Sequence, residues 1–134
     1  MKKQTRRTFV ASAVTLGASA AASAMPSMEK EKKVLVHHAF FWLKNPDSKE
    51  DLAKLLAGLE TLRKIETIKQ IHIGVTASTE KRPVVDSSFH ASELMFFDSL
   101  DGQKTYQDHP IHQKFIADCG HLWDKVIVYD AMDV

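Results

Sequence analysis

The sequence predicts a single α+β domain, in which helices cover one face of a four-stranded antiparallel sheet. The chain has 134 residues, of which 44% are hydrophobic and 26% charged, so its size and composition suit one soluble domain. Between residues 34 and 130, strand-like and helix-like segments follow each other in the order β-α-β-β-α-α-β. This order is typical of an α+β sheet with its helices on one side.

Residues 1–24 resemble an export signal. Four basic residues within the first seven positions precede an apolar run from Phe9, which ends in Ala22-Ser23-Ala24. The stretch "TRRTFV" resembles the twin-arginine signal, whose passengers leave the cytoplasm already folded. The apolar run is shorter than the about 20 residues that cross a bilayer. We therefore expect cleavage before Met25, a periplasmic protein with no membrane span, and a flexible leader over residues 25–33.

Composition excludes several classes of function. Cleavage would leave 14 of the 18 Lys and Arg beside 17 Asp and Glu, a formal charge of −3, which argues against nucleic-acid binding. The glycines form no phosphate-binding loop, so no nucleotide is expected and no cofactor is predicted. The single cysteine, Cys119, cannot form an internal disulfide, so stability must come from packing or from a partner subunit.

The first half of the domain predicts a strand, a helix and a second strand. Residues 34–44, "VLVHHAFFWLK", are β-branched or aromatic and apolar at both parities, as in a strand covered on both faces. Residues 45–65 predict a helix capped by Asp47 or Ser48, with a stripe at helical spacing formed by Leu52, Leu55, Leu56, Leu59 and Leu62. Residues 69–75, "KQIHIGV", predict a strand with its isoleucines on one face.

The second half begins with a loop over residues 76–88, where polar residues and Pro83 dominate. A third strand is expected at about 89–97, and Ser99 can cap a short helix that carries Tyr106. Pro110 interrupts this helix and suits the first position of a new one, which is expected to run to about Leu122 with His109 as its N-cap.

The segment "KVIVYD", residues 125–130, predicts the fourth strand. The complete order is similar to the ferredoxin-like split βαβ arrangement. A sheet with helices on one side should have one apolar and one wet face, yet the first strand is apolar on both faces and the third strand nearly so. This excess of apolar surface predicts a homodimer formed sheet to sheet.

Tyr106 and His112 are the first candidate site residues. In one unbroken helix, side chains six residues apart would point about 120° away from each other. A turn at His109-Pro110 would let both side chains converge on one cavity. His112 would then lie in the first turn of its helix, where the helix dipole favours a neutral imidazole that can accept a proton.

The histidines do not predict a metal site. His37 and His38 are neighbours on a strand and face opposite sides, and Pro110 separates His109 from His112 at a helix start.

The sequence is identified as a member of the stress-responsive A/B barrel (Dabb) family, which forms dimeric α/β barrels. The resemblance spans residues 34–130 and rests on the blocks "HHAFFWLK", "FDSLDGQKTYQDHPIHQKF" and "LWDKVIVYD". A plant member of this family is a cofactor-free polyketide cyclase. By position, its catalytic pair corresponds to Tyr106 and His112, and its supporting residues correspond to His37 and Asp130. The first and last strands, if antiparallel, would place His37 beside Asp130.

The resemblance implies roles for these four residues if the site is catalytic. His112 would remove a proton from a carbon flanked by carbonyls, and Tyr106 would donate a hydrogen bond to the enolate oxygen. Asp130 would orient a ring and stabilise an imidazolium, with His37 bridging or positioning.

Three functions remain open. The protein is an exported binder of a small hydrophobic or aromatic metabolite, a cofactor-independent cyclase or lyase, or a structural stress-response oligomer whose cavity is incidental.

Overall fold

The computed structural model describes residues 33–134, so the predicted signal at 1–24 and all but the last residue of the predicted leader lie outside the described residues. The elements are β1 (Leu35–Leu43), α2 (Lys49–Thr61), a 3₁₀ turn (Leu62–Lys64), β2 (Gln70–Val75), β3 (Ala91–Phe97), α3 (Leu100–Asp108), α4 (Pro110–Cys119), a 3₁₀ turn (Gly120–Leu122) and β4 (Trp123–Met132). The predicted order of strands and helices is confirmed.

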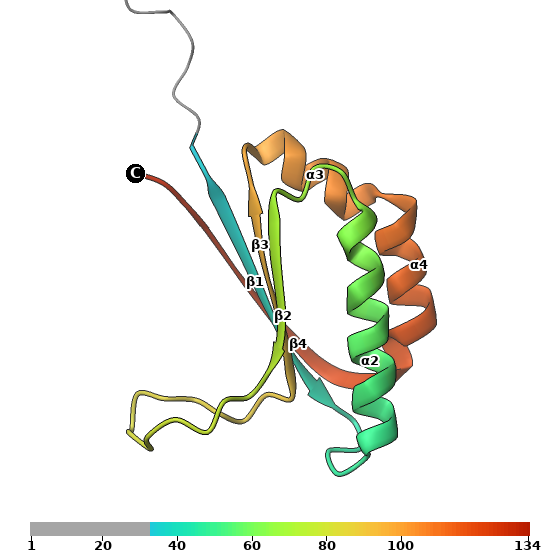
Figure 1. Cartoon of the computed structure of the whole chain (residues 1–134), viewed down its shortest axis with the longest axis vertical. Helices are drawn as coiled ribbons and strands as arrows, with labels where there is room; N and C mark the ends of the chain where they lie inside the picture. Colours follow the sequence, from blue (N-terminus) through green and yellow to red (C-terminus); the bar gives the residue numbers. More distant parts are fainter. Residues whose placement is uncertain (1–32) are drawn as a thin grey trace, which may run out of the picture. The chain divides into compact units, whose positions relative to one another are not determined.

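The four strands form one antiparallel sheet in the order β2-β3-β1-β4, which is the ferredoxin-like arrangement expected from the sequence. All three helices lie on one face of this sheet (Figure 1). No helix within residues 33–134 is long and apolar enough to cross a bilayer.

Helix starts follow local capping. Ser48 accepts a hydrogen bond from the backbone N–H of Asp51, and Ser99 accepts one from Gly102, so both helices begin where a short side chain satisfies a free N–H group. His109 has an extended backbone and caps α4, whose first residue is Pro110. The α-helix ends at Cys119, and the predicted run to Leu122 is completed by the 3₁₀ turn.

The core lies between the helices and one face of the sheet. Residues of β1 alternate between buried and half-buried, so one parity of the strand faces the helices. The same face of β3 carries Ala91, Met95 and Phe97, which pack against Leu55 and Leu59 of α2 in the core cluster. Glu93 shares this face of β3 and is also buried.

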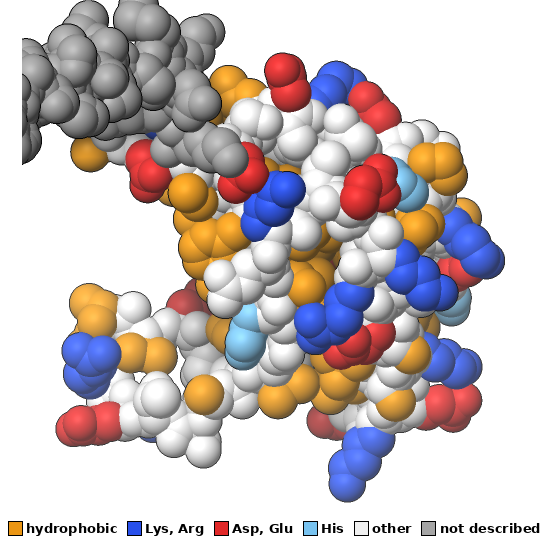
Figure 2. Space-filling view, turned by 45° about the horizontal axis from the view of Figure 1, so that its top comes forward, with side chains coloured by type: hydrophobic (Ala, Val, Ile, Leu, Met, Phe, Trp, Pro, Cys, Tyr) orange, Lys and Arg blue, Asp and Glu red, His pale blue; other side chains and the backbone are white. Residues whose placement is uncertain are grey.

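The opposite face of the sheet has no helix over it (Figure 1). Strand pairing places an apolar set on this face, which we call the open face: Val36, Phe40, Trp42, Leu94, Phe96, Ile127 and Tyr129. Phe89 precedes β3 and packs edge-on against Phe40, with ring centroids 4.9 Å apart. Hydrophobic side chains also gather along the hollowed flank seen in Figure 2.

The connection between β2 and β3, residues 76–90, contains no helix or strand, as the polar composition predicts. It projects from the end of the sheet on the side away from the helices (Figure 1). The third strand starts at Ala91, two residues later than expected, and β4 extends beyond 125–130 at both ends.

Candidate active site

The junction between α3 and α4 brings Tyr106 and His112 together. Tyr106 lies in the last turn of α3 and His112 in the first turn of α4, with the extended residue His109 between the two helices. The two rings have centroids 4.6 Å apart. The break at Pro110 therefore gives the convergence that one continuous helix could not.

A backbone hydrogen bond fixes the orientation and the tautomer of His112. Its Nδ1 lies 3.1 Å from the carbonyl oxygen of Gln107, and since a carbonyl can only accept, Nδ1 carries the proton in the neutral ring. Nε2 then has a free lone pair. Burial lowers the pKa of His112 despite this hydrogen bond and the nearby Glu93, so the ring is neutral near pH 7.

Tyr106 is 1% exposed and donates a hydrogen bond from its hydroxyl to Oε1 of Glu93, over 3.2 Å. Burial raises the pKa of Tyr106 far above its usual range, and the negative charge of Glu93 raises it further. The phenol is therefore neutral and serves as a hydrogen-bond donor.

His37 lies between two carboxylates. Its Nδ1 is 2.7 Å from Oδ1 of Asp130, and its Nε2 is 3.7 Å from Oε1 of Glu93. Burial lowers the pKa of His37, but interactions with Glu93 and Asp130 outweigh this effect, so the net pKa is raised. His37 and Asp130 are also direct partners in the β1–β4 register, as antiparallel pairing predicts.

Asp130 orients the ring of His37, because the register of β4 places it opposite that residue. Its expected part in stabilising an imidazolium during catalysis stays a prediction.

Glu93 is the site residue that our sequence analysis missed. Its side chain contacts both Tyr106 and His37, and it is 2% exposed. The signal was its position along the strand, because Glu93 shares the covered face of β3 with Ala91, Met95 and Phe97. A buried acid in such a position indicates a polar partner from another element.

These side chains line a cavity of about 170 Å³ between α4 and the β1–β4 half of the sheet. Along β1, His37 is followed on the same face by Ala39 and Phe41, and β4 runs opposite from Asp130 to Val128 and Val126. One end of the cavity is therefore polar and the other apolar. The apolar lining consists of Ala39, Phe41, Phe115, Ile116, Trp123, Val126 and Val128.

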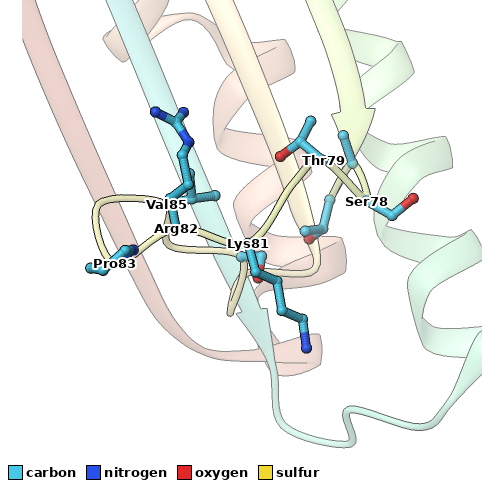
Figure 3. A pocket seen from close by; sticks show the side chains of 9 residues that line it. Ser78, Thr79, Lys81, Arg82, Pro83 and Val85 are labelled. Atoms are coloured by element: carbon cyan, nitrogen blue, oxygen red, sulfur yellow. The ribbon is translucent and has the colours of Figure 1, made fainter.

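A larger hollow of about 610 Å³ lies within the loop between β2 and β3. Its two cationic side chains, Lys81 and Arg82, point away from one another (Figure 3). The lining comes from a single connection without helix or strand, residues 76–87, and includes none of the paired titratable groups found beside Tyr106. Convergent polar groups favour the smaller cavity as the functional site.

The described part of the chain contains no set of side chains that could bind a metal ion. Across residues 33–134, no three His, Cys, Asp or Glu side chains are grouped to hold an ion.

The fold and the site define a ferredoxin-like α+β domain with a buried Tyr-Glu-His cluster beside a small cavity. The chain belongs to the family of the stress responsive A/B barrel domain (Dabb), whose model matches residues 35–133.

Three similar proteins illustrate the relationship. A stress-response A/B barrel domain-containing protein of Arabidopsis thaliana is 31% identical over 85 residues, which cover 63% of this chain and 73% of the relative. A dimeric ferredoxin-like protein of unknown function from Thermobifida fusca is 17% identical, with a TM-score of 0.61 over 78% of this chain and 95% of its own. A hydroxynitrile lyase from Passiflora edulis is 18% identical, with a TM-score of 0.63 over 78% of this chain and 96% of its own.

Proposed function

We propose that this protein binds a small, largely apolar metabolite in the cavity beside Tyr106 and His112. The observation that carries the proposal is the lining of the cavity, where apolar side chains of β1, α4 and β4 lead to a polar end. Such a lining gives a ligand both burial of its hydrocarbon part and a fixed orientation.

The size of the cavity limits the ligand. Pockets for drug-sized molecules measure about 300–1,000 Å³, whereas an apolar cavity of about 150 Å³ holds benzene. The cavity of about 170 Å³ therefore suits a single aromatic ring or a short branched chain. Val126, Val128 and Ile116 are partly exposed at its edge, so an apolar ligand meets apolar side chains on entry.

An NMR titration of the purified protein with toluene tests the proposal. We expect saturable shifts of resonances from the lining residues, and we expect Val128→Trp to abolish them by filling the cavity. The control is Val84→Trp, which changes an exposed loop residue outside the lining. Absence of saturable shifts in the unmodified protein, or equal binding by Val128→Trp, would leave the cavity incidental and favour a structural oligomer.

Export and dimerisation belong to the same proposal. The "TRRTFV" stretch supports twin-arginine export to the periplasm, and replacement of Arg6 and Arg7 by Lys should retain a reporter fused to residues 1–24 in the cytoplasm.

The apolar open face supports a homodimer formed sheet to sheet, and similar solved structures are described as dimeric.

A second candidate function is cofactor-independent proton transfer, as in a cyclase or lyase. It is favoured by the tautomer of His112, whose Nε2 lone pair is free to accept a proton from carbon. Tyr106 would donate to the developing enolate oxygen only after its hydroxyl leaves Glu93. The likeness to a hydroxynitrile lyase supports no more than the ability of this fold to carry a lyase.

Hydrogen–deuterium exchange at the central carbon of acetylacetone tests this candidate. Catalysed exchange should be lost in His112→Ala and retained in His121→Ala, which changes an exposed histidine outside the cavity lining. Equal exchange rates in the two variants would exclude His112 as the base.

A further inference from the structure

Glu93 has one carboxylate oxygen that the fold leaves without a partner. Oε1 accepts the hydrogen bond of Tyr106 and lies 3.7 Å from His37. Oε2 is buried and has no hydrogen-bond partner within residues 33–134. Since a buried acceptor without a donor costs about 1–3 kcal/mol, and more when it is charged, native structures rarely keep one without a reason.

The two strand neighbours of Glu93 offer no donor for Oε2. The strand register places Ala39 of β1 and Ile73 of β2 beside it, and neither side chain can donate a hydrogen bond. Glu93 does line the cavity, together with Tyr106 and His112. A molecule inside the cavity therefore lies beside the carboxylate of Glu93.

The charges at the polar end disfavour an anionic ligand. No lysine or arginine is among the residues that line the cavity. The imidazole of His37 is already held between Asp130 and Glu93, and His112 is neutral near pH 7. A ligand carboxylate would lose its hydration, meet no free cation and lie close to Glu93.

We propose that Glu93 selects the ligand by accepting a hydrogen bond from a hydroxyl group on it, so that the cavity takes small neutral alcohols and rejects carboxylates of the same size. This inference rests on the proposed binding function and adds the polar group that the ligand must carry. A hydroxyl satisfies Oε2 without adding a second charge to the buried His37–Glu93 pair.

Benzyl alcohol and benzoate form a suitable pair of probes, because both have one ring and differ mainly in the polar group. In NMR titrations of the full-chain protein at pH 7, we expect benzyl alcohol to bind at least about tenfold more tightly than benzoate, the factor that one charge-assisted hydrogen bond supplies. Glu93→Gln keeps the shape of the side chain and removes its charge. In this variant the preference for the alcohol should fall to about threefold or less.

Glu80→Gln is the matched control. It makes the same change at an exposed carboxylate outside the cavity lining, so the preference for benzyl alcohol should remain about tenfold. Benzoate binding as tightly as benzyl alcohol in the unmodified protein, or a full preference retained in Glu93→Gln, overturns the inference. If Glu93→Gln does not fold, the comparison of the two probes in the unmodified protein still decides.

The toluene titration separates this inference from the function on which it rests. If toluene binds but benzoate binds as tightly as benzyl alcohol, only the role of Glu93 is refuted. Failure of both toluene and benzyl alcohol to bind refutes the binding function itself.

Discussion

The hydroxyl of Tyr106 donates to Oε1 of Glu93 across 3.2 Å and joins α3 to β3 inside the core. The acceptor is charged and shielded from water, so the bond is stronger than an exposed one and its loss leaves a buried carboxylate with one donor fewer.

Tyr106→Phe should therefore lower the free energy of unfolding by about 1–3 kcal/mol. Urea unfolding followed by far-ultraviolet circular dichroism measures the change. Tyr129, the second tyrosine of the chain, is 64% exposed, and Tyr129→Phe should alter stability by no more than about 0.5 kcal/mol. Equal effects of the two substitutions would show that the Tyr106–Glu93 bond does not contribute to stability.

Gly58 should resist substitution because α2 and α4 approach closely there. A Cβ atom at position 58 would overlap Sγ of Cys119 and lie 3.1 Å from Cδ1 of Phe115. We expect Gly58→Ala to destabilise the fold by about 1–3 kcal/mol, although Gly→Ala usually stabilises a helix.

Two comparisons isolate the steric cause at Gly58. Adding Cys119→Ala should recover part of the stability lost in Gly58→Ala, so the two effects should not be additive. Gly102→Ala in α3, where the nearest atom would be 3.5 Å away, should be stabilising by about 0.5–1 kcal/mol. A stable Gly58→Ala variant would contradict the close approach of the two helices.

The pKa values of His37 and His112 should be shifted in opposite directions. The pKa of His37 is raised because Glu93 and Asp130 together outweigh burial, whereas burial lowers the pKa of His112. In a proton NMR titration, we expect the midpoint of His37 above 6.5 and that of His112 below 6.5. Coincident midpoints would contradict the described environments.

The raised pKa of His37 also makes the free energy of unfolding depend on pH. The folded state holds this proton more tightly than the unfolded chain, so the stabilisation is complete below about pH 6.5 and is lost as pH rises through the folded pKa. Asp130→Asn should thus reduce the free energy of unfolding more at about pH 6 than at about pH 9. Asp124→Asn, on the same strand but outside the His37 cluster, should show no such dependence.

The open face should govern self-association. We expect light scattering at micromolar concentration to give a dimer for the unmodified protein and a monomer for Phe40→Asp, because a charge in the apolar face would lose hydration on contact. Leu100→Asp, at an exposed position that begins α3, should remain dimeric. A monomeric unmodified protein, or a dimeric Phe40→Asp variant, would contradict this prediction.

Local chemistry made much of the fold predictable. Caps act within three residues, so Ser99 and His109 could be identified from the sequence with the helices they begin, and the cap of α2 could be narrowed to Asp47 or Ser48. The length of β4 could not, because its ends are held by pairing with β1 rather than by its own composition. Strand boundaries therefore depended on a distant partner.

The candidate site also has a part that the sequence predicts and a part that it does not. The convergence of Tyr106 and His112 follows from Pro110, which is local, and the His37–Asp130 contact follows from antiparallel order. The role of Glu93 depends on Tyr106 and His37, which reach it from α3 and β1, and no pattern within β3 identifies these partners.

The junction at His109-Pro110 has no spare length, since a single extended residue separates the two helices. One added residue inside the first turn of α4 would rotate His112 by about 100° about the helix axis and carry its ring away from Tyr106. Natural insertions and deletions should therefore spare this corner and accumulate in the projecting connection between β2 and β3, where the backbone has no comparable alignment to keep.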